Sequence, residues 1–333
     1  MSLWAQLIGL KKGGFNVVEN NKESTSTVRV KSMIEQNRQK QSFRAVGEKA
    51  VPTVLLVIAL ISILTTIGIV FVLITETFEF FNRVSLVEFF TGTVLRPLSQ
   101  DPKFGILPLI NGTIISSVIA MLVAGPIGMM TAIYLSEYAS DKARRVLKPV
   151  LELLAGIPTV VYGFFAFTFV TPFLRQFIPE MGATNILAPG LVMGVMIIPM
   201  IASLSEDAMN SVPNDMREGA LALGSTKLEV TFKVIIPAAF SGIVAAFVLG
   251  ISRAVGETMI VAIASGSSKN FIFDVTQSMQ TMTAYVVEVA GGDTSPGSTI
   301  YYSLYAVAMT LFIFTLLMNI LARYIARRFR EEY

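Results

Sequence analysis

The chain of 333 residues is 53% apolar and only 15% charged, which is typical of a membrane protein rather than of a soluble domain. Its formal net charge of +3 is too small to indicate nucleic acid as a partner. The sequence has no cysteine and no histidine, which excludes Cys/His zinc sites, disulfides and catalytic triads with a histidine base. We therefore expect neither a catalytic residue nor a metal ligand in this chain.

Six apolar segments are long enough to cross a bilayer, because a helix of roughly 20 residues spans about 30 Å of hydrocarbon. They cover residues 51–75, 104–136, 153–174, 181–205, 234–268 and 294–322. The sequence thus predicts an all-α membrane protein with six transmembrane helices. These helices form a domain over residues 51–322, with a polar arm before it over 1–50 and a basic tail after it over 323–333.

Lysine and arginine are concentrated in every second connecting segment. Residues 1–50, 137–152, 206–233 and 323–333 contain 20 of the 26 basic side chains, whereas the alternate segments contain five. Basic residues are retained on the cytoplasmic side of a membrane. We therefore expect both termini, and the two basic loops between them, to lie in the cytoplasm.

The predicted cytoplasmic loop over residues 206–236 is too polar to be a membrane span. Its pattern predicts two short helices joined by a turn: Pro213 suits a first helical turn, Gly224 suits a helix end, and Ser225 or Thr226 can cap the next helix. Such a hairpin would project from the membrane and could dock a partner. An incidental amphipathic hairpin is the alternative.

In this loop the sequence resembles the permease subunits of ATP-binding-cassette importers. Their signature is Glu-Ala-Ala, three residues, Gly, nine residues, Ile, one residue and Leu-Pro. Glu218, Ala220, Gly224 and Pro237 match it in register, while Gly219 replaces the first alanine. The resemblance implies the type I importer permease fold and a coupling surface at these five residues that inserts into a separate ATPase.

The chain has no Gly-x-x-x-x-Gly-Lys-Ser/Thr loop that could hold nucleotide phosphates. We therefore expect it to bind no cofactor and to be a channel-forming transport subunit rather than an enzyme. ATP and Mg would bind to the separate ATPase subunit, which would carry out the hydrolysis.

Arg253 and Glu257 are the charged residues in the middle of the fifth predicted span, and a spacing of four residues predicts that they pair on one helix face. Because charge is costly inside a bilayer, the pair indicates a functional site. The planar arginine fork suits an oxyanion, so we expect Arg253 to contact or gate the substrate and Glu257 to orient it. An ion pair that fixes helix register is the alternative. Asn111, Ser252 and Thr258 are further candidates for the substrate pathway. For Asn111 and Thr258 the alternative is hydrogen bonding to the backbone or between helices.

Two stretches narrow the resemblance to the phosphate importer permeases. They are Ser-Arg-Ala-Val-Gly-Glu-Thr-Met at 252–259 and Leu-Glu-Leu-Leu-Ala-Gly-Ile-Pro-Thr-Val-Val-Tyr-Gly-Phe at 151–164. The methionine after Glu-Thr is similar to the PstC type of the two paired permeases.

This resemblance implies a multi-pass protein of the bacterial inner membrane that imports inorganic phosphate. Its implied partners are a PstA-like permease, two copies of a cytoplasmic ATPase and an extracytoplasmic phosphate-binding protein. The same machinery for sulfate or molybdate is one alternative, and a non-transporting membrane sensor or scaffold is another.

Overall fold

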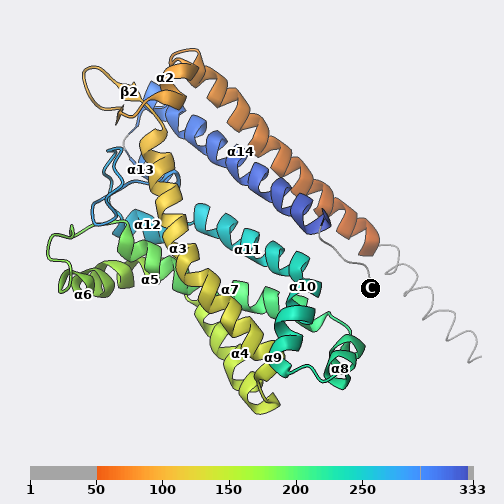
Figure 1. Ribbon diagram of the computed structural model, residues 1–333. Helices are drawn as coiled ribbons and strands as arrows, with labels where there is room; N and C mark the ends of the chain where they lie inside the picture. The colour runs from red at the N-terminus through yellow and green to blue at the C-terminus, as the bar shows by residue number, and fades with distance from the viewer. Residues whose placement is uncertain (1–50, 293, 329–333) are drawn as a thin grey trace, which may run out of the picture. The chain divides into compact units, whose positions relative to one another are not determined.

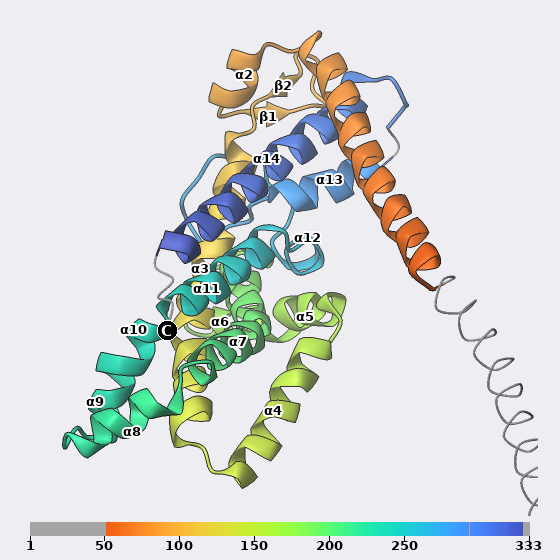
Figure 2. The same ribbon diagram turned by 90° about the vertical axis from the view of Figure 1, so that its right-hand side faces the viewer.

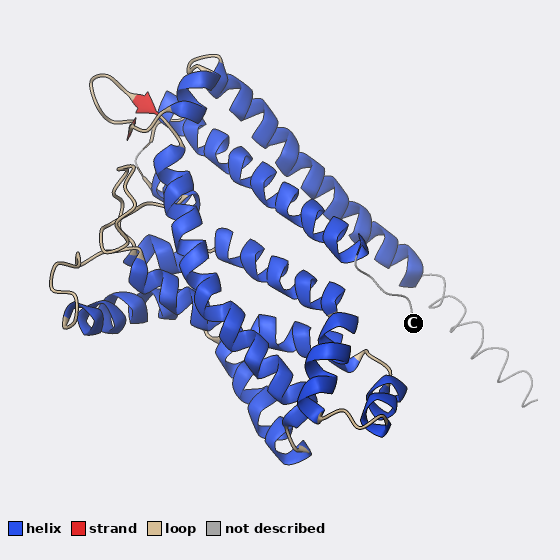
Figure 3. Cartoon of the chain, viewed as in Figure 1, coloured by secondary structure: helices blue, strands red, loops and turns tan. Residues whose placement is uncertain are grey.

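The computed structural model describes residues 51–292 and 294–328, which are mostly helical (Figure 3). The predicted N-terminal arm over residues 1–50 lies outside the described residues, as do residues 329–333 of the predicted tail. The chain divides into two compact units, Met1–Phe71 and Val72–Tyr333, and each is described by itself.

The first described helix, Val51–Phe81, begins in the first unit. Its large apolar side chains from Val51 to Ile69 are all exposed. A helix that is apolar on every side is stable in lipid, because its backbone N–H and C=O groups are hydrogen-bonded within the helix and its alkyl side chains are solvated by the lipid chains. This helix therefore confirms the first predicted span and continues beyond residue 75.

The other elements belong to the second unit. In chain order they are α2 (Leu86–Thr91), β1 (Leu95–Arg96), β2 (Lys103–Phe104), α3 (Leu107–Ile133), η1 (Tyr134–Tyr138), α4 (Asp141–Gly156), α5 (Thr159–Phe165), η2 (Ala166–Val170), α6 (Thr171–Arg175), α7 (Leu187–Asn210), α8 (Asn214–Ala222), α9 (Lys227–Val230), η3 (Thr231–Ile235), α10 (Ile236–Ala238), α11 (Phe240–Val255), α12 (Met259–Ala264), α13 (Met282–Gly291) and α14 (Thr299–Arg328).

Helices α3 and α7 form the centre of the second unit, and α11 packs against both of them (Figure 1). Small residues allow α3 and α7 to approach closely. A Cβ atom added at Gly190 would lie 2.8 Å from Ile119, and one added at Gly194 would lie 2.7 Å from Val123. Close packing of this kind replaces the hydrophobic effect as the main attraction between helices in lipid.

Within the described residues, four helices are long and apolar enough to cross a membrane, and two bent helix pairs would raise the number to six. The third predicted span, 153–174, is not one straight helix. α4 ends at Gly156, and the helices before and after this break meet at 86°. Ile157 is extended there because the following Pro158 disfavours helical backbone at the preceding residue.

The fifth predicted span, 234–268, is also broken. The helix pair Lys227–Ala238 and Phe240–Val255 bends by 73°. α11 then ends at Val255, and α12 begins only at Met259. The last predicted span ends later than expected, because α14 continues through residues 323–328 of the predicted tail.

The two ends of the second unit carry different elements (Figures 1 and 2). α8, α9 and the beginning of α4 lie at one end, whereas α2 and the antiparallel β1–β2 pair lie at the other. The basic segments 137–152 and 206–233 therefore share one end.

Candidate functional site

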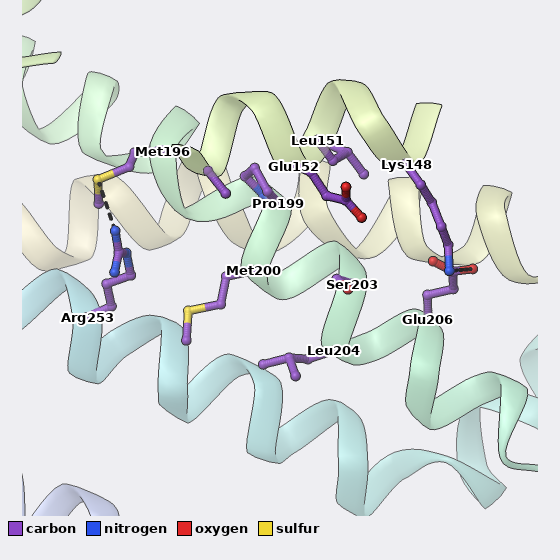
Figure 4. A pocket seen from close by; sticks show the side chains of 11 residues that line it. Lys148, Leu151, Glu152, Met196, Pro199, Met200, Ser203, Leu204, Glu206 and Arg253 are labelled. Atoms are coloured by element: carbon purple, nitrogen blue, oxygen red, sulfur yellow. Dashed lines mark hydrogen bonds and ion pairs between the residues drawn. The ribbon is translucent and has the colours of Figure 1, made fainter. Parts of the chain in front are cut away.

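Helices α4, α7 and α11 line a pocket of about 480 Å³ (Figure 4). Its lining residues are Lys148, Leu151, Glu152 and Ala155 from α4, Met196, Pro199, Met200, Ser203, Leu204 and Glu206 from α7, and Arg253 from α11. Arg253 lies toward one end of the pocket, and Lys148 lies beside Glu206 toward the other. The lining thus carries two cations and two carboxylates, Glu152 and Glu206, and Lys148 is paired with Glu206 at 3.0 Å. Arg253 is the cation of this pocket that lies away from that pair.

Arg253 is placed in this pocket by the last turn of α11. Its side chain is exposed, and Nη2 lies 3.8 Å from the sulfur of Met196. A thioether is a weak hydrogen-bond acceptor, so this contact leaves the guanidinium available for a stronger, anionic acceptor. The predicted substrate contact thus lies where an anion can reach it.

The predicted pairing of Arg253 with Glu257 is wrong. Because α11 ends at Val255, residues 253 and 257 do not share a helix face, and these two described side chains form no ion pair. Glu257 is 8% exposed, and its Oε1 accepts hydrogen bonds from the backbone N–H groups of Met259 at 3.1 Å and Ile260 at 3.3 Å. Glu257 therefore caps the beginning of α12, where the helix dipole favours a negative charge.

The other three predicted pathway residues do not line the pocket around Arg253. Ser252 Oγ lies 3.3 Å from Asn319 Oδ1 of α14. Thr258 lines a separate pocket of about 360 Å³ beside α13 and α14. Asn111 is buried, and its Nδ2 donates to the backbone carbonyl of Ile272. Ser252 and Asn111 thus bond other segments of the chain, and for Asn111 this hydrogen bond to the backbone is the alternative role considered above.

The hairpin predicted within residues 206–236 is formed by α8 and α9, which project at one end of the unit (Figure 2). Gly224 follows α8 with φ +88°, a conformation that favours glycine. Thr226 begins α9: its Oγ1 accepts from Glu229 N at 3.3 Å, and its own N–H donates to Glu229 Oε2 at 3.0 Å. The backbone hydrogen bond from Thr226, with further help from Lys233, lowers the pKa of the Glu229 carboxyl to about 2.

The predicted coupling residues lie on this hairpin or directly after it. Glu218, Gly219 and Gly224 are exposed, Ala220 is half-buried, and Pro237 is exposed in α10. Their exposure leaves the surface open to a partner.

Leu223 was not singled out in the sequence, yet it is 90% exposed at the tip of the hairpin. It is an apolar side chain in a polar loop, which is the signal that could have revealed it. Isolated exposed leucines are common, but this one lies directly before the predicted coupling residue Gly224.

Glu206 is the other site residue that the sequence did not reveal. It was expected to begin the cytoplasmic loop, whereas α7 continues to Asn210 and buries the Glu206 carboxylate to 1% exposure. Its Oε1 lies 3.0 Å from Lys148 Nζ and 3.6 Å from Arg144 Nε. Its Oε2 has no hydrogen-bond partner among the residues that the structure describes. The signal in the sequence that could have revealed this burial is the helical spacing of Glu206 relative to the apolar residues of α7.

Comparison with known proteins agrees with this architecture. Residues 124–331 match the family model described as binding-protein-dependent transport system inner membrane component. The chain is 36% identical over 311 residues to the probable ABC transporter permease protein YqgH of Bacillus subtilis (strain 168), covering 93% of this chain and 98% of that protein. It is 33% identical over 267 residues to the phosphate transport system permease protein PstC of Xylella fastidiosa (strain 9a5c), covering 74% of this chain and 80% of that protein.

The fold is also found in a solved structure. A chain of the bacterial alginate ABC transporter, in complex with an alginate pentasaccharide-bound periplasmic protein, superposes with a TM-score of 0.56 at 14% identity. The match covers 82% of this chain and 95% of that chain. At this identity the likeness concerns the fold alone.

Proposed function

Because the chain belongs to the family of binding-protein-dependent transport system inner membrane components, we propose that it is the permease subunit of an ATP-driven importer of inorganic phosphate. The main support is its 33% identity to a phosphate transport permease over 80% of that protein's length. The chain forms part of the membrane channel, and ATP hydrolysis belongs to a separate ATPase subunit.

The orientation follows from the basic segments. Residues 137–152 and 206–233 share one end of the second unit, and basic residues are retained in the cytoplasm. This end would therefore face the cytoplasm, with both chain termini on the same side of the bacterial inner membrane. α2 and the β1–β2 pair would face an extracytoplasmic phosphate-binding protein.

The complex would contain this chain, a PstA-like permease and two copies of a cytoplasmic ATPase that binds ATP and Mg. The exposed residues Glu218, Gly219 and Gly224 would contact the ATPase, with Ala220 packing beneath them and Pro237 at the end of the loop. Closure of the ATPases on ATP would move α8, and alternating access would open the pathway first outward and then inward.

Phosphate would pass Arg253, whose guanidinium can donate two parallel hydrogen bonds to phosphate oxygens. Lys148 lies toward the other end of the same pocket, where Glu206 already balances its charge, so Arg253 would be the main contact for the anion. Glu257 would act on this path only by fixing the break between α11 and α12.

Labelled phosphate uptake at low external concentration tests this function. Cells that lack the gene would be complemented with the wild-type chain or with Arg253→Ala, with and without excess sulfate. We expect the wild type to restore uptake that sulfate does not suppress. We expect an assembled Arg253→Ala complex to lose about tenfold or more, since a hydrogen bond to a charged group contributes about 1.5–3 kcal/mol. Uptake that sulfate abolishes would assign the importer to another oxyanion.

A further inference from the structure

A continuous series of polar contacts joins the coupling helix α8 to α4, which lines the pocket. We propose that this series, here called the coupling network and formed by Arg217, Glu137, Ser136, Asn210, Glu206 and Lys148, transmits the movement of α8 to the pocket. The proposal rests on the proposed function, because it presumes that an ATPase moves α8. Arg217 is the residue of the coupling network that lies on α8, and it acts by fixing the position of α8 relative to α7 and η1.

Arg217 lies beside the coupling residue Glu218, but its side chain turns inward and is only 17% exposed. Nη1 donates to the carbonyl of Val212 at 2.9 Å, and Nη2 donates to the carbonyl of Met209 at 2.7 Å. Nη2 also lies 3.2 Å from Oε1 of Glu137 in η1. One guanidinium therefore bonds α8 both to the end of α7 and to the end of the α3–η1 helix, which the single ammonium of a lysine cannot reproduce.

The network continues across the cytoplasmic ends of α3 and α7. Ser136 Oγ lies 2.9 Å from Oε1 of Glu137 and 3.1 Å from Oδ1 of Asn210. The amide of Asn210 donates from Nδ2 to Oε1 of Glu206 at 3.4 Å, one helical turn earlier in α7. The Ser136 hydroxyl has one proton and donates to one of its two acceptors at a time, while its oxygen stays in contact with both. The series of contacts therefore extends from Arg217 to Glu206 through this shared donor.

The last step crosses from α7 to α4. Glu206 Oε1 lies 3.0 Å from Lys148 Nζ and 3.6 Å from Arg144 Nε. Arg144 also donates to the backbone carbonyl of Leu135, which ties α4 to η1 as well. Because both Lys148 and Glu206 line the pocket, a shift of α7 relative to α4 would change its width and its charge.

Burial explains why these contacts would transmit movement rather than break. The Glu137 and Glu206 side chains are 8% and 1% exposed, so water cannot replace a lost partner easily. Separating a buried carboxylate from its cation leaves an uncompensated charge, which is strongly unfavourable. The helix ends of α8, α7, η1 and α4 are therefore held to move together.

The network would be tested in the whole complex, reconstituted in liposomes with both permeases, the ATPases and the binding protein. The measured quantity is labelled phosphate taken up per ATP hydrolysed. A residue that only stabilises the fold lowers uptake and hydrolysis together, whereas loss of transmission lowers their ratio. Wild-type liposomes that take up no phosphate would contradict the proposed function itself, independently of any variant.

We expect Arg217→Lys and Asn210→Ala each to lower the ratio of phosphate taken up to ATP hydrolysed by about fivefold or more. A fivefold change corresponds to the lower end of typical coupling free energies. The double variant should be no worse than the stronger single variant, because both interrupt the same series. Arg145→Lys, an equivalent change at an exposed arginine of α4, should keep the wild-type ratio. A wild-type ratio in either single variant, or additive losses in the double variant, would overturn the proposal.

Ser136→Ala provides a second test if Arg217→Lys prevents assembly. It removes only the hydroxyl oxygen between Glu137 and Asn210. We expect a lowered ratio in an assembled complex, and an unchanged ratio would overturn the proposal.

Discussion

The ammonium group of Lys148 lies 3.0 Å from Oε1 of Glu206, a carboxylate that α7 buries almost completely. The Lys148 side chain is 39% exposed, so the pair is only partly screened by solvent. Removing the negative charge of Glu206 would leave Lys148 and Arg144 close together without the anion that both of them contact.

Glu206→Gln is therefore expected to destabilise the purified complex by about 1–3 kcal/mol, less than for a fully buried pair because Lys148 is partly solvated. The midpoint of thermal unfolding in detergent measures this. Lys103→Met is the control, since it removes ion pairs with Asp101 and Glu88 in which all three side chains are exposed, and it should change the midpoint little. Equal shifts in the two variants would show that Glu206 has no special role.

Leu223 offers a direct test of the coupling surface, because it is 90% exposed at the tip of the α8–α9 hairpin. Leu223→Asp should leave the permease folded but weaken its association with the ATPase by about tenfold or more, since burying a new charge in an apolar contact is unfavourable. Co-purification of the ATPase measures the association. Leu98→Asp is the matched control. Leu98 is 85% exposed in the loop between β1 and β2, which lie at the opposite end of the unit from the hairpin, so this change should not affect ATPase binding.

The hairpin could be predicted from the sequence because its signals are local. Pro213 precedes α8, Gly224 has the positive φ angle expected after a helix, and Thr226 caps α9. Each signal acts through hydrogen bonds within a few residues, so no knowledge of the tertiary structure is needed.

The candidate pathway could be predicted only in part. Arg253 could be identified because a charge inside an apolar segment is conspicuous. The expected pairing of Arg253 with Glu257 was wrong, because hydropathy does not show that the helix ends between these two residues. The 86° bend lies at Gly156-Ile157-Pro158, where these helix-interrupting residues predict a kink, whereas the 73° bend was not predicted, since apolar composition does not specify backbone direction. Glu206 acquires its partners only through contact between α4 and α7, which sequence spacing cannot reveal.

Gly194 tests the close approach of α3 and α7. A Cβ atom there would lie 2.7 Å from Val123, so Gly194→Ala forces the two helices apart and should destabilise the protein by about 1–3 kcal/mol. Thermal unfolding of the purified protein checks this. Gly68→Ala is the control, because a Cβ at Gly68 meets nothing within 4 Å, and this change should be neutral or slightly stabilising. A neutral Gly194→Ala would show that the helices are less tightly packed than the structure indicates.

Glu229 makes the beginning of α9 insensitive to pH near neutrality. Its pKa is lowered from 4.5 to about 2, mainly by the backbone hydrogen bond from Thr226, so the capping contact is fully formed above pH 4.5. The stabilisation should be lost as the pH falls from 4.5 toward 2, where the folded carboxyl becomes protonated. Hydrogen exchange over residues 226–230, corrected for the intrinsic rate, should show constant protection between about pH 5 and 8. A loss of protection within that range would contradict the reciprocal contacts between Thr226 and Glu229.

Glu257 distinguishes a helix cap from a partner of Arg253. Its Oε1 accepts from the N–H groups of Met259 and Ile260, and a glutamine oxygen can accept the same bonds. Glu257→Gln should therefore retain most phosphate uptake, whereas Glu257→Ala should destabilise the protein by about 1 kcal/mol and lower uptake through loss of the cap. Uptake and thermal unfolding would be measured on both variants. If Glu257→Gln and Glu257→Ala abolished uptake equally without changing stability, the negative charge itself would be required and the cap would be insufficient as an explanation.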